Sequence, residues 1–568
     1  MAASVNETTT RVQETPHSQI SKLSYPSWYS PENGIYQSKH PHIKIPSEPF
    51  LDVVSYIFSQ KHNGIHALID SSSGFSISYS HLSSLVKSIA SGLHTMGVKQ
   101  GDVILILLPN SIYFPVVFLG ALSIGAIVTT MNPLSTLLEI KKQVLDSNAI
   151  LGFSVLDKVD ELVNGLEGFN VIGVPEALKF DSVSIDDGSV FRKLISSDPS
   201  MAPRPKIRQH DTAAILYSSG TTGRPKGVML THGNFIAMVE LFVRFEASLY
   251  DYTSTKNVYL AVVPMFHVYG LSLFVMGLLS LGNTIVTMRR FDADDMVRAI
   301  DKYGVTHLHV VPPLMTALTR KGKSGSSNSF KSLQQVSCGA APMSTKSIEE
   351  FIETFPHVDF IQGYGMTEST AIGTRGYNTV VVKKHSSVGL LSPNSEAKVV
   401  DWVTGSYLPP GSVGELWLRS PGVMKGYLNN TEASMAAIDK DGWLHTGDIV
   451  YFDREGYLYV LDRLKEIIKY KGFQVAPADL EAVLLSHPDV LDAAVTAERD
   501  EEAGEIPVAF VVPKNGSPVT PEAVMNYVAN QVAPYKKVRK VYFRSSIPRS
   551  AAGKILRREL RNLLTSKL

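Results

Sequence analysis

The chain has 568 residues, too many for one ordinary domain, and its length predicts one large domain with a smaller one. Hydrophobic residues make up 44% and charged residues 19%, which is typical of a soluble globular protein. A formal net charge of +1 provides no overall field to hold a nucleic-acid backbone, so we expect no nucleic-acid partner. The single cysteine, Cys338, excludes an intramolecular disulfide and a multi-cysteine metal site, and we expect it to be a small buried residue.

The N-terminal segment is polar and lacks the apolar core of a secretory signal. We interpret residues 1–35 as a disordered arm, with a transit peptide as the alternative that its two early glutamates disfavour. Two uncharged stretches, residues 114–133 and 268–288, approach the length of a membrane span. Glycines interrupt both stretches and turn residues end them, so we expect a buried helix followed by a strand in each, and no membrane span.

Apolar runs alternate with helical patterns through the first two thirds of the chain. Strands are expected at residues 103–108, 213–217, 258–263, 284–288, 307–311 and 334–337, and helices at 296–303 and 346–354. This alternation favours α/β layers with largely parallel sheets. From residue 389 onward, short runs at 397–401, 414–419 and 457–461 are separated by tight turns and indicate a small β-rich subdomain.

A charged strip at residues 462–472, with no turn signal of its own, precedes a second α/β alternation. Its elements are expected at residues 478–485, 490–497, 508–512, 521–531 and 540–543. Their extent is that of a small domain. We therefore predict the α/β class: a large N-terminal domain of αβ layers with a β-rich subdomain over residues 36–462, and a small mobile C-terminal α/β domain over 463–568.

The chain ends in Ser566-Lys567-Leu568, the tripeptide that the peroxisomal import receptor reads. A surface helix expected at residues 554–564 would leave this tripeptide accessible, and a chance match is the alternative. We therefore expect a peroxisomal location, with the import receptor as a partner.

The strongest local signal is YSSGTTGRPKG at residues 217–227, directly after a buried strand. Its hydroxyls, glycines and lysine can surround a phosphate with backbone and side-chain donors. The spacing differs from that of a Walker A loop. A flexible linker is the alternative, but a linker needs neither the buried strand nor the Pro-Lys-Gly ending.

This loop resembles the signature loop of the adenylate-forming enzymes, which include acyl-CoA synthetases, peptide-synthetase adenylation domains and beetle luciferases. Further matching motifs follow in order: PMFHVYG at 264–270, GAAP at 339–342, QGYGMTE at 362–368, GWLHTGD at 442–448, DRLK at 462–465 and IPRSAAGK at 547–554. The resemblance runs from about residue 35 to the C-terminus and is greatest to plant 4-coumarate:CoA ligase-like proteins of the peroxisomal type. It implies an ATP-dependent acid:CoA ligase that forms an acyl-adenylate, with ATP, coenzyme A and Mg²⁺ as its small-molecule requirements.

The resemblance also implies roles for residues in the nucleotide site. The β- and γ-phosphates would be held by Ser218, Ser219, Gly220, Thr221, Thr222 and Lys226. Thr367 would contact the α-phosphate, Glu368 would coordinate Mg²⁺, and Asp448 and Arg463 would bind the ribose. Gln362, Gly363 and Ala340 would frame the adenine and the acyl end. Taken alone, Glu368 or the Asp448 and Arg463 pair could be solvated surface.

The remaining roles concern the catalytic cations and the charged strip. Lys554 would neutralise the reacting carboxylate and the α-phosphate together, which needs a cation because two anions must meet. Lys465 would be the hinge between the domains. The strip also carries Lys469 and Gln474 on the nucleotide side and Lys471 and Gly472 on the coenzyme A side, with Arg290 as a further coenzyme A contact.

The acid pocket is implied to be lined by Tyr269, Leu273, Ser337, Ala340 and Arg375, with His267 as its gate. A packed core histidine is the alternative for His267. Typical 4-coumarate:CoA ligases have a lysine in place of Ser337 and a serine in place of Leu273, and the loss of these polar groups favours a more apolar acid. The acid expected is 4-coumarate or a related cinnamate-type acid, with medium-chain fatty or oxylipin acids as the alternative. A luciferase-like monooxygenase and an inactive binding module are alternatives of other classes.

Overall fold

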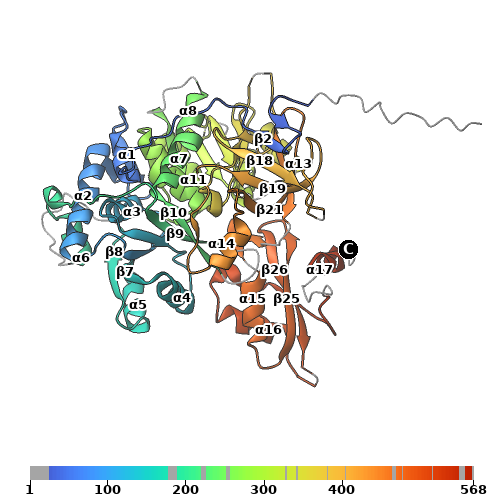
Figure 1. Ribbon diagram of the computed structural model, residues 1–568. Helices are drawn as coiled ribbons and strands as arrows, with labels where there is room; N and C mark the ends of the chain where they lie inside the picture. Colours follow the sequence, from blue (N-terminus) through green and yellow to red (C-terminus); the bar gives the residue numbers. More distant parts are fainter. Residues whose placement is uncertain are drawn as a thin grey trace, which may run out of the picture.

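The computed structural model describes residues 25–565, apart from residues 177–188, 219–224, 251–255, 326–328, 341–342, 344, 380, 403, 464–467, 476, 515 and 549–556. Four sheets within the described ranges carry the fold, three in the larger part of the chain and one near the C-terminus. Figure 1 shows the strands β25 and β26 of the last sheet to one side of the other three.

The first sheet has seven strands, five of them parallel, and it lies between two groups of helices. In sheet order the strands are β20 (Gly426–Tyr427), β10 (Lys226–Thr231), β9 (Thr212–Ser218), β6 (Ile127–Thr130), β5 (Val103–Leu107), β7 (Ala149–Val155) and β8 (Asn170–Val174). Every residue of β5 is buried. Ile104 and Ile106 pack in one core cluster, with α2 (Tyr79–Thr95) and α3 (Tyr113–Ser123). The alternate residues of β5 pack in another, with α4 (Leu137–Ser147) and α5 (Val159–Gly165). The continuous apolar run reflects burial on both faces.

The second sheet has nine strands, six of them parallel. In sheet order they are β17 (Leu390–Leu391), β16 (Thr374–Arg375), β15 (Asp359–Tyr364), β14 (Gln335–Cys338), β13 (His307–Val310), β11 (Val258–Ala261), β12 (Thr284–Thr287), β3 (His66–Asp70) and β4 (Ser76–Ser78). One face is covered by α11 (Ala293–Tyr303), α12 (Pro312–Ser324) and α13 (Thr345–Thr354) through Met296, Met315 and Phe351. Cys338 is buried at the end of β14, as expected, and burial raises the pKa of its thiol.

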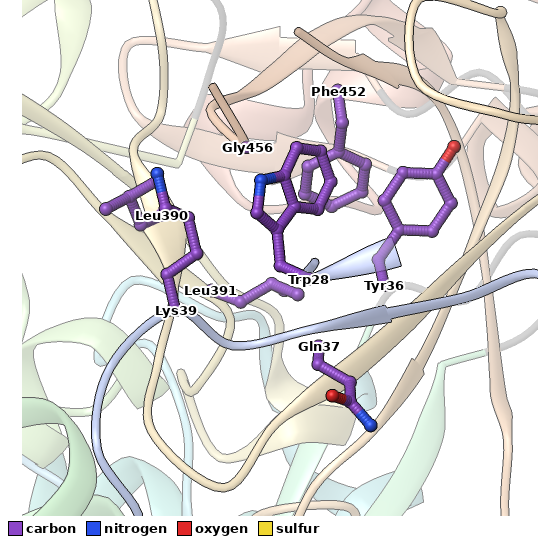
Figure 2. A pocket seen from close by; sticks show the side chains of 8 residues that line it. All are labelled: Trp28, Tyr36, Gln37, Lys39, Leu390, Leu391, Phe452 and Gly456. Carbon is purple, nitrogen blue, oxygen red and sulfur yellow. The ribbon is translucent and has the colours of Figure 1, made fainter. Parts of the chain in front are cut away.

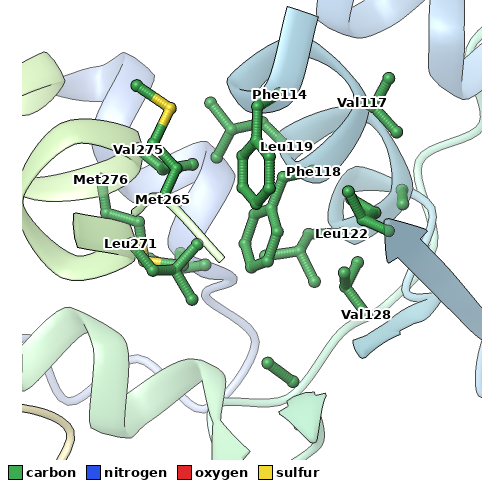
Figure 3. Packing of buried hydrophobic residues seen from close by; sticks show 14 of the residues in the cluster. Phe114, Val117, Phe118, Leu119, Leu122, Val128, Met265, Leu271, Val275 and Met276 are labelled. Carbon is green, nitrogen blue, oxygen red and sulfur yellow. The ribbon is translucent and has the colours of Figure 1, made fainter. Parts of the chain in front are cut away.

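The main core lies between these two sheets (Figure 3). Phe114 and Phe118 of α3 stack on each other, with ring centroids 6.3 Å apart. In Figure 3 they lie between Met265 and Leu271 on one side and Leu122 and Val128 on the other. The second sheet supplies its side of this core through the helical segment of α9 (Val268–Gly270), the π-helix Leu271–Gly277 and α10 (Leu278–Ser280).

Both uncharged stretches form a buried helical segment followed by a strand, α3 with β6 and residues 268–280 with β12, as predicted. Over the ranges that the structure describes, no helix is long and apolar enough to cross a membrane.

The third sheet has six strands and forms the predicted β-rich subdomain. Its strands are β1 (Tyr29–Ser30), β2 (Ile35–Gln37), β18 (Glu396–Val400), β19 (Gly414–Arg419), β21 (Leu444–Phe452) and β22 (Leu458–Arg463). The prediction that the arm extends to residue 35 is wrong, because β1 and β2 pair with each other and β2 pairs with β18. Tyr36 is fully buried and stacks on Phe452 with centroids 4.6 Å apart, which ties this segment to the sheet.

The fourth sheet has five strands: β24 (Phe473–Val475), β23 (Ile468–Tyr470), β26 (Gly504–Pro513), β25 (Val490–Asp500) and β27 (Lys540–Phe543). It packs with α15 (Pro477–Leu485), α16 (Pro521–Ala529) and α17 (Arg557–Thr565). The charged strip does contain a turn, at Lys471 and Gly472, whose φ angles of 47° and 82° are left-handed. The last strand of the third sheet ends at Arg463 and the first of the fourth begins at Ile468, while the exact domain boundary stays a prediction.

Candidate active site

The carboxyl ends of the parallel strands in the first two sheets meet at one place. Asn110, just after β5, donates two hydrogen bonds of 3.0 Å, to the carbonyls of Ala261 and Val263, and accepts one of 2.7 Å from the Met265 amide. Thr130, at the end of β6, donates to the carbonyl of Phe266 at 2.6 Å. Ligands of open α/β sheets bind at the carboxyl ends of the strands. These contacts therefore fix the loop before His267 where a ligand is expected.

Glu368 is the centre of a buried cluster at the start of the predicted phosphate loop. Its side chain is 6% exposed and accepts hydrogen bonds from Ser218 Oγ at 2.8 Å and from the Tyr427 hydroxyl at 3.0 Å. Ser218 ends β9, and Tyr427 lies on the two-residue strand β20. Burial, followed by the Glu368 charge, raises the pKa of Tyr427, so this hydroxyl stays a donor. No sequence motif indicated Tyr427.

Lys226 lies at the other end of the loop, directly opposite Ser218 in the antiparallel pair of β9 and β10. Its Nζ is 4.9 Å from the centre of the Tyr427 ring. The structure thus brings Ser218, Lys226 and Glu368 together around Tyr427, while their predicted roles stay predictions. Ser219, Gly220, Thr221 and Thr222 lie outside the described residues.

Side chains on β15 and β21 form a second polar group. Asp448 is 1% exposed and accepts a hydrogen bond of 2.7 Å from the Tyr364 hydroxyl. Arg463 stands directly opposite Asp448 in the pairing of β21 with β22, although its side chain is outside the described part. Tyr364 lies in the QGYGMTE motif but had no predicted role.

The rest of this motif surrounds the same strand end. Gln362 is buried on β15 and donates to the carbonyl of His385 at 2.7 Å, while Gly363 is paired with Arg375 of β16. Thr367 is 8% exposed and begins the 3₁₀ turn Thr367–Ser369 that carries Glu368. One segment therefore connects the Asp448 group to the Glu368 cluster.

The predicted acid pocket lies beside β14. The Tyr269 hydroxyl donates to the carbonyl of Ser337 at 3.5 Å, and a Cβ on Gly339 would lie 3.6 Å from that hydroxyl. Ala340, which follows, has a left-handed φ of 67°. His267 caps α9, with Nδ1 accepting from the Tyr269 amide at 3.4 Å, and burial lowers its pKa to about 4. His267 is therefore neutral at physiological pH.

The structure shows further contacts for two residues of the predicted acid pocket, Leu273 and Arg375. Leu273 is 1% exposed and belongs to the main core cluster. Arg375 forms an ion pair of 2.6 Å with Glu246 and lies 5.1 Å from the Phe242 ring. Burial raises the pKa of Glu246 to about 7 against the lowering effect of Arg375. The sequence did not indicate this partner.

The turn at Lys471 and Gly472 reaches the larger part of the chain. A Cβ on Gly472 would lie 3.0 Å from Cγ2 of Val311, the residue that follows β13. Lys469 and Gln474 pair on β23 and β24, with the Gln474 side chain outside the described part. Arg290 is exposed after β12, two strands away from β13 in the same sheet. Lys465, Lys554 and residues 566–568 lie outside the described residues.

A separate recess opens in the third sheet (Figure 2). Its lining includes Trp28, Tyr36, Leu391 and Phe452, and none of the predicted site residues contributes to it. We therefore place the candidate site at the strand ends and not at this recess.

Comparisons with known proteins identify the family of the chain. Residues 58–428 match the AMP-binding enzyme family, and residues 479–554 match the AMP-binding enzyme C-terminal domain. Among curated relatives, the chain is 57% identical to "4-coumarate--CoA ligase-like 6" of Arabidopsis thaliana, over 98% of each chain. It is 43% identical to "Peroxisomal OPC-8:0-CoA ligase 1" of the same plant, over 95% of this chain and 98% of the relative.

Among solved structures, the fold is similar to a double mutant of the o-succinylbenzoate CoA synthetase of Bacillus subtilis bound to a product analogue, OSB-NCoA. The TM-score is 0.77 at 26% identity, and the match covers 91% of this chain and 98% of that one.

Proposed function

The chain belongs to the AMP-binding enzyme family and is an acid:CoA ligase of the adenylate-forming type, and we propose how its described residues divide the two half-reactions. In the first, an oxygen of the acid's carboxylate attacks the α-phosphorus of ATP, and diphosphate leaves. In the second, the sulfur of coenzyme A attacks the acyl carbon, and AMP leaves. The observation that carries the proposal is the buried cluster of Ser218, Glu368 and Tyr427 beside the phosphate loop.

For the first half-reaction the chain must bring two anions together. Lys226 and the loop hydroxyls would hold the β- and γ-phosphates, and Lys554 would neutralise the reacting oxygens. Thr367, at the start of the turn before Glu368, would contact the α-phosphate. Asp448, oriented by Tyr364, would accept hydrogen bonds from the ribose hydroxyls, with Arg463 opposite it.

The donor set at Glu368 fits Mg²⁺, which prefers oxygen ligands and is commonly bound by one or two carboxylates together with substrate phosphates. One oxygen of Glu368 is fixed by two hydroxyl donors, which holds the carboxylate in one orientation. Mg²⁺ bound there would neutralise charge on the phosphates during the transfer. Glu368 is therefore the residue that would hold the ion.

For the second half-reaction the thiol must approach the acyl carbon. The Lys471 and Gly472 turn lies against Val311 at the carboxyl end of β13, on the same sheet edge as the predicted acid pocket. We propose that this arrangement is the one that accepts coenzyme A, with Arg290 and Lys471 as cations for its phosphates. The likeness to a synthetase bound to a CoA product analogue supports this assignment. Adenylation would then need a different arrangement, reached by rotation at Lys465.

The pocket chemistry favours an acid with an uncharged, largely apolar body. Ser337 and Leu273 offer no cation, and the guanidinium of Arg375 is already paired with Glu246. A cinnamate-type acid such as 4-coumarate is the first candidate, supported by the 57% identical relative named for 4-coumarate. An oxylipin or medium-chain acid is the second, favoured by the apolar lining and by the similarity to an OPC-8:0-CoA ligase.

We also propose that the protein works in the peroxisome, imported through the receptor that reads the C-terminal Ser-Lys-Leu. The similarity to a relative named as peroxisomal supports this location. A fluorescent fusion at the N-terminus should accumulate in peroxisomes, and deletion of residues 566–568 should leave it in the cytosol. Unchanged accumulation after the deletion would contradict the role of the tripeptide.

The function is tested by thioester formation with 4-coumarate, cinnamate, octanoate and a cyclopentanone-bearing oxylipin acid, each with ATP, Mg²⁺ and coenzyme A. Lys554→Ala is the control and should lower adenylate formation by about 10²-fold or more with every acid. Preference for 4-coumarate would establish the hydroxycinnamate assignment. Preference for an acid without a phenol would establish the second candidate.

A further inference from the structure

The small C-terminal part contacts the large part through a largely buried lysine. Lys536, at the end of the short turn Pro534–Lys536, donates to Glu139 Oε1 at 2.8 Å and to Asp479 Oδ2 at 3.3 Å. Glu139 is on α4 of the first sheet's helical layer, whereas Asp479 is on α15 beside the fourth sheet (Figure 1). The three side chains are only 13%, 16% and 17% exposed. The three side chains form an ion triad that joins the large part of the chain to the small C-terminal part.

Further contacts fix the position of the triad on both the large and the small part. On the large part, Glu139 uses its other oxygen, Oε2, to accept from the amide and hydroxyl of Thr136 at 2.9 and 3.0 Å, which closes a capping box at the start of α4. On the small part, Tyr535 stacks on Phe473 of β24 with centroids 4.5 Å apart. Phe473, the first residue after the Lys471 and Gly472 turn, therefore packs on the sequence neighbour of Lys536.

The charges in this triad depend on one another. Burial works against the Lys536 cation, but Tyr535, Glu139 and Asp479 together raise its pKa, so it stays charged. Burial raises the pKa of Asp479, and Glu139 raises it further, against the effect of Lys536. Without the lysine, two carboxylates would face each other in a poorly solvated place. Removing one partner of a buried ion pair costs far more than removing an exposed one.

We propose that Lys536 is a positioning residue for thioester formation: it is paired with Asp479 inside the small domain, and through Glu139 it holds that domain where the Lys471 and Gly472 turn meets Val311. The proposal rests on the proposed function, which assigns this arrangement to the coenzyme A half-reaction. Lys536 does not touch the reacting atoms. Its contact with Glu139 exists only while the small domain is in this arrangement, so this contact stabilises one half-reaction and not the other.

The two half-reactions are measured separately. Adenylation is followed by acid-dependent ATP–diphosphate exchange, and transfer by single-turnover reaction of preformed acyl-adenylate with coenzyme A. In Lys536→Met, transfer should fall about tenfold while exchange stays within about twofold of the wild type. Glu139→Gln should act in the same direction, because glutamine keeps the capping box but lacks the charge. The double variant should lose less than the product of the two single losses, since both remove one interaction.

A matched control distinguishes loss of the triad from the general effect of removing a lysine from the small domain. Lys540 pairs with Glu498 at 2.6 Å inside the small domain and is 47% exposed, so Lys540→Met should leave both half-reactions unchanged. If Lys536→Met lowers both half-reactions equally, its role is structural and the proposal is wrong. If transfer stays within twofold of the wild type, the triad does not position the domain.

A distance measurement that needs no substrate tests the triad independently of the proposed function. Spin labels at Glu161→Cys on α5 and Glu522→Cys on α16 report the distance between the two parts, because Cys338 is buried and the two chosen positions are exposed. The distance distribution should be narrow in the labelled parent and broad after Lys536→Met. An unchanged distribution would refute the claim that the triad holds the small domain, even if the ligase activity is established. A broadened distribution would support that claim, even if no acid in the panel forms a thioester.

Discussion

Replacing Tyr427 by phenylalanine tests the cluster around Glu368. The change removes a single hydroxyl that donates to Glu368 at 3.0 Å, and it keeps the ring that lies 4.9 Å from Lys226 Nζ. No large cavity is created, because the remaining side chain has nearly the same shape. Any effect therefore reports the hydrogen bond to the buried carboxylate.

The expected magnitude follows from the geometry. A hydrogen bond to a charged group contributes about 1.5–3 kcal/mol, and Ser218 still supplies a second donor at 2.8 Å, which favours the lower end. About 1.5 kcal/mol corresponds to about a tenfold loss. We expect kcat/KM for acid-dependent ATP–diphosphate exchange to fall about tenfold, with half-maximal activity shifted to higher Mg²⁺ concentration.

Tyr36→Phe is the matched control. Its hydroxyl is also buried and donates to the carbonyl of Leu408 at 2.7 Å, but it lies in the third sheet, next to the recess of Figure 2. This variant should lose about 1 kcal/mol of unfolding free energy and keep full exchange activity. Equal exchange by Tyr427→Phe and the wild type, with both folded, would refute the role of the cluster.

Three further predictions concern other parts of the site. Asn110→Ala should lower the free energy of unfolding by about 3 kcal/mol in urea titration, because three buried backbone groups lose their partner; a loss below 1 kcal/mol would contradict the bridge between the sheets. Tyr364→Phe should raise the KM for ATP about fivefold with kcat nearly unchanged, since Asp448 loses its 2.7 Å donor, and a lower kcat at unchanged KM would contradict ribose binding. Stability should fall as pH decreases from about 6.5 to 4, because burial and Arg375 lower the pKa of His307 to about 3, so the unfolded chain binds the extra protons; urea midpoints that stay level over this window would contradict it.

Much of the α/β framework is predictable because the core strands are buried on both faces. The run at β5 is apolar throughout, and the stretch that became α3 and β6 is uncharged, so local composition alone marks them. The motif order predicted roles for Ser218, Lys226, Glu368 and Asp448, and the structure places these residues in two connected, largely buried groups.

The features that escaped prediction depend on contacts between distant parts of the chain. The strand β2 pairs with β1 and also with β18, some 360 residues later, and this second pairing has no local signal. Tyr427 acts from a two-residue strand whose short length carries no periodic signal. Glu246, the buried partner of Arg375, lies just after a π-helical segment at 239–244, a geometry that no local pattern indicated.

The most direct test of the account is product analysis with purified protein, ATP, Mg²⁺, coenzyme A and the acid panel. The account predicts one acyl-CoA and one AMP for each acid consumed, with an acyl-adenylate detectable when coenzyme A is omitted. Formation of ADP in place of AMP, or an acyl-CoA without a preceding adenylate, would contradict it.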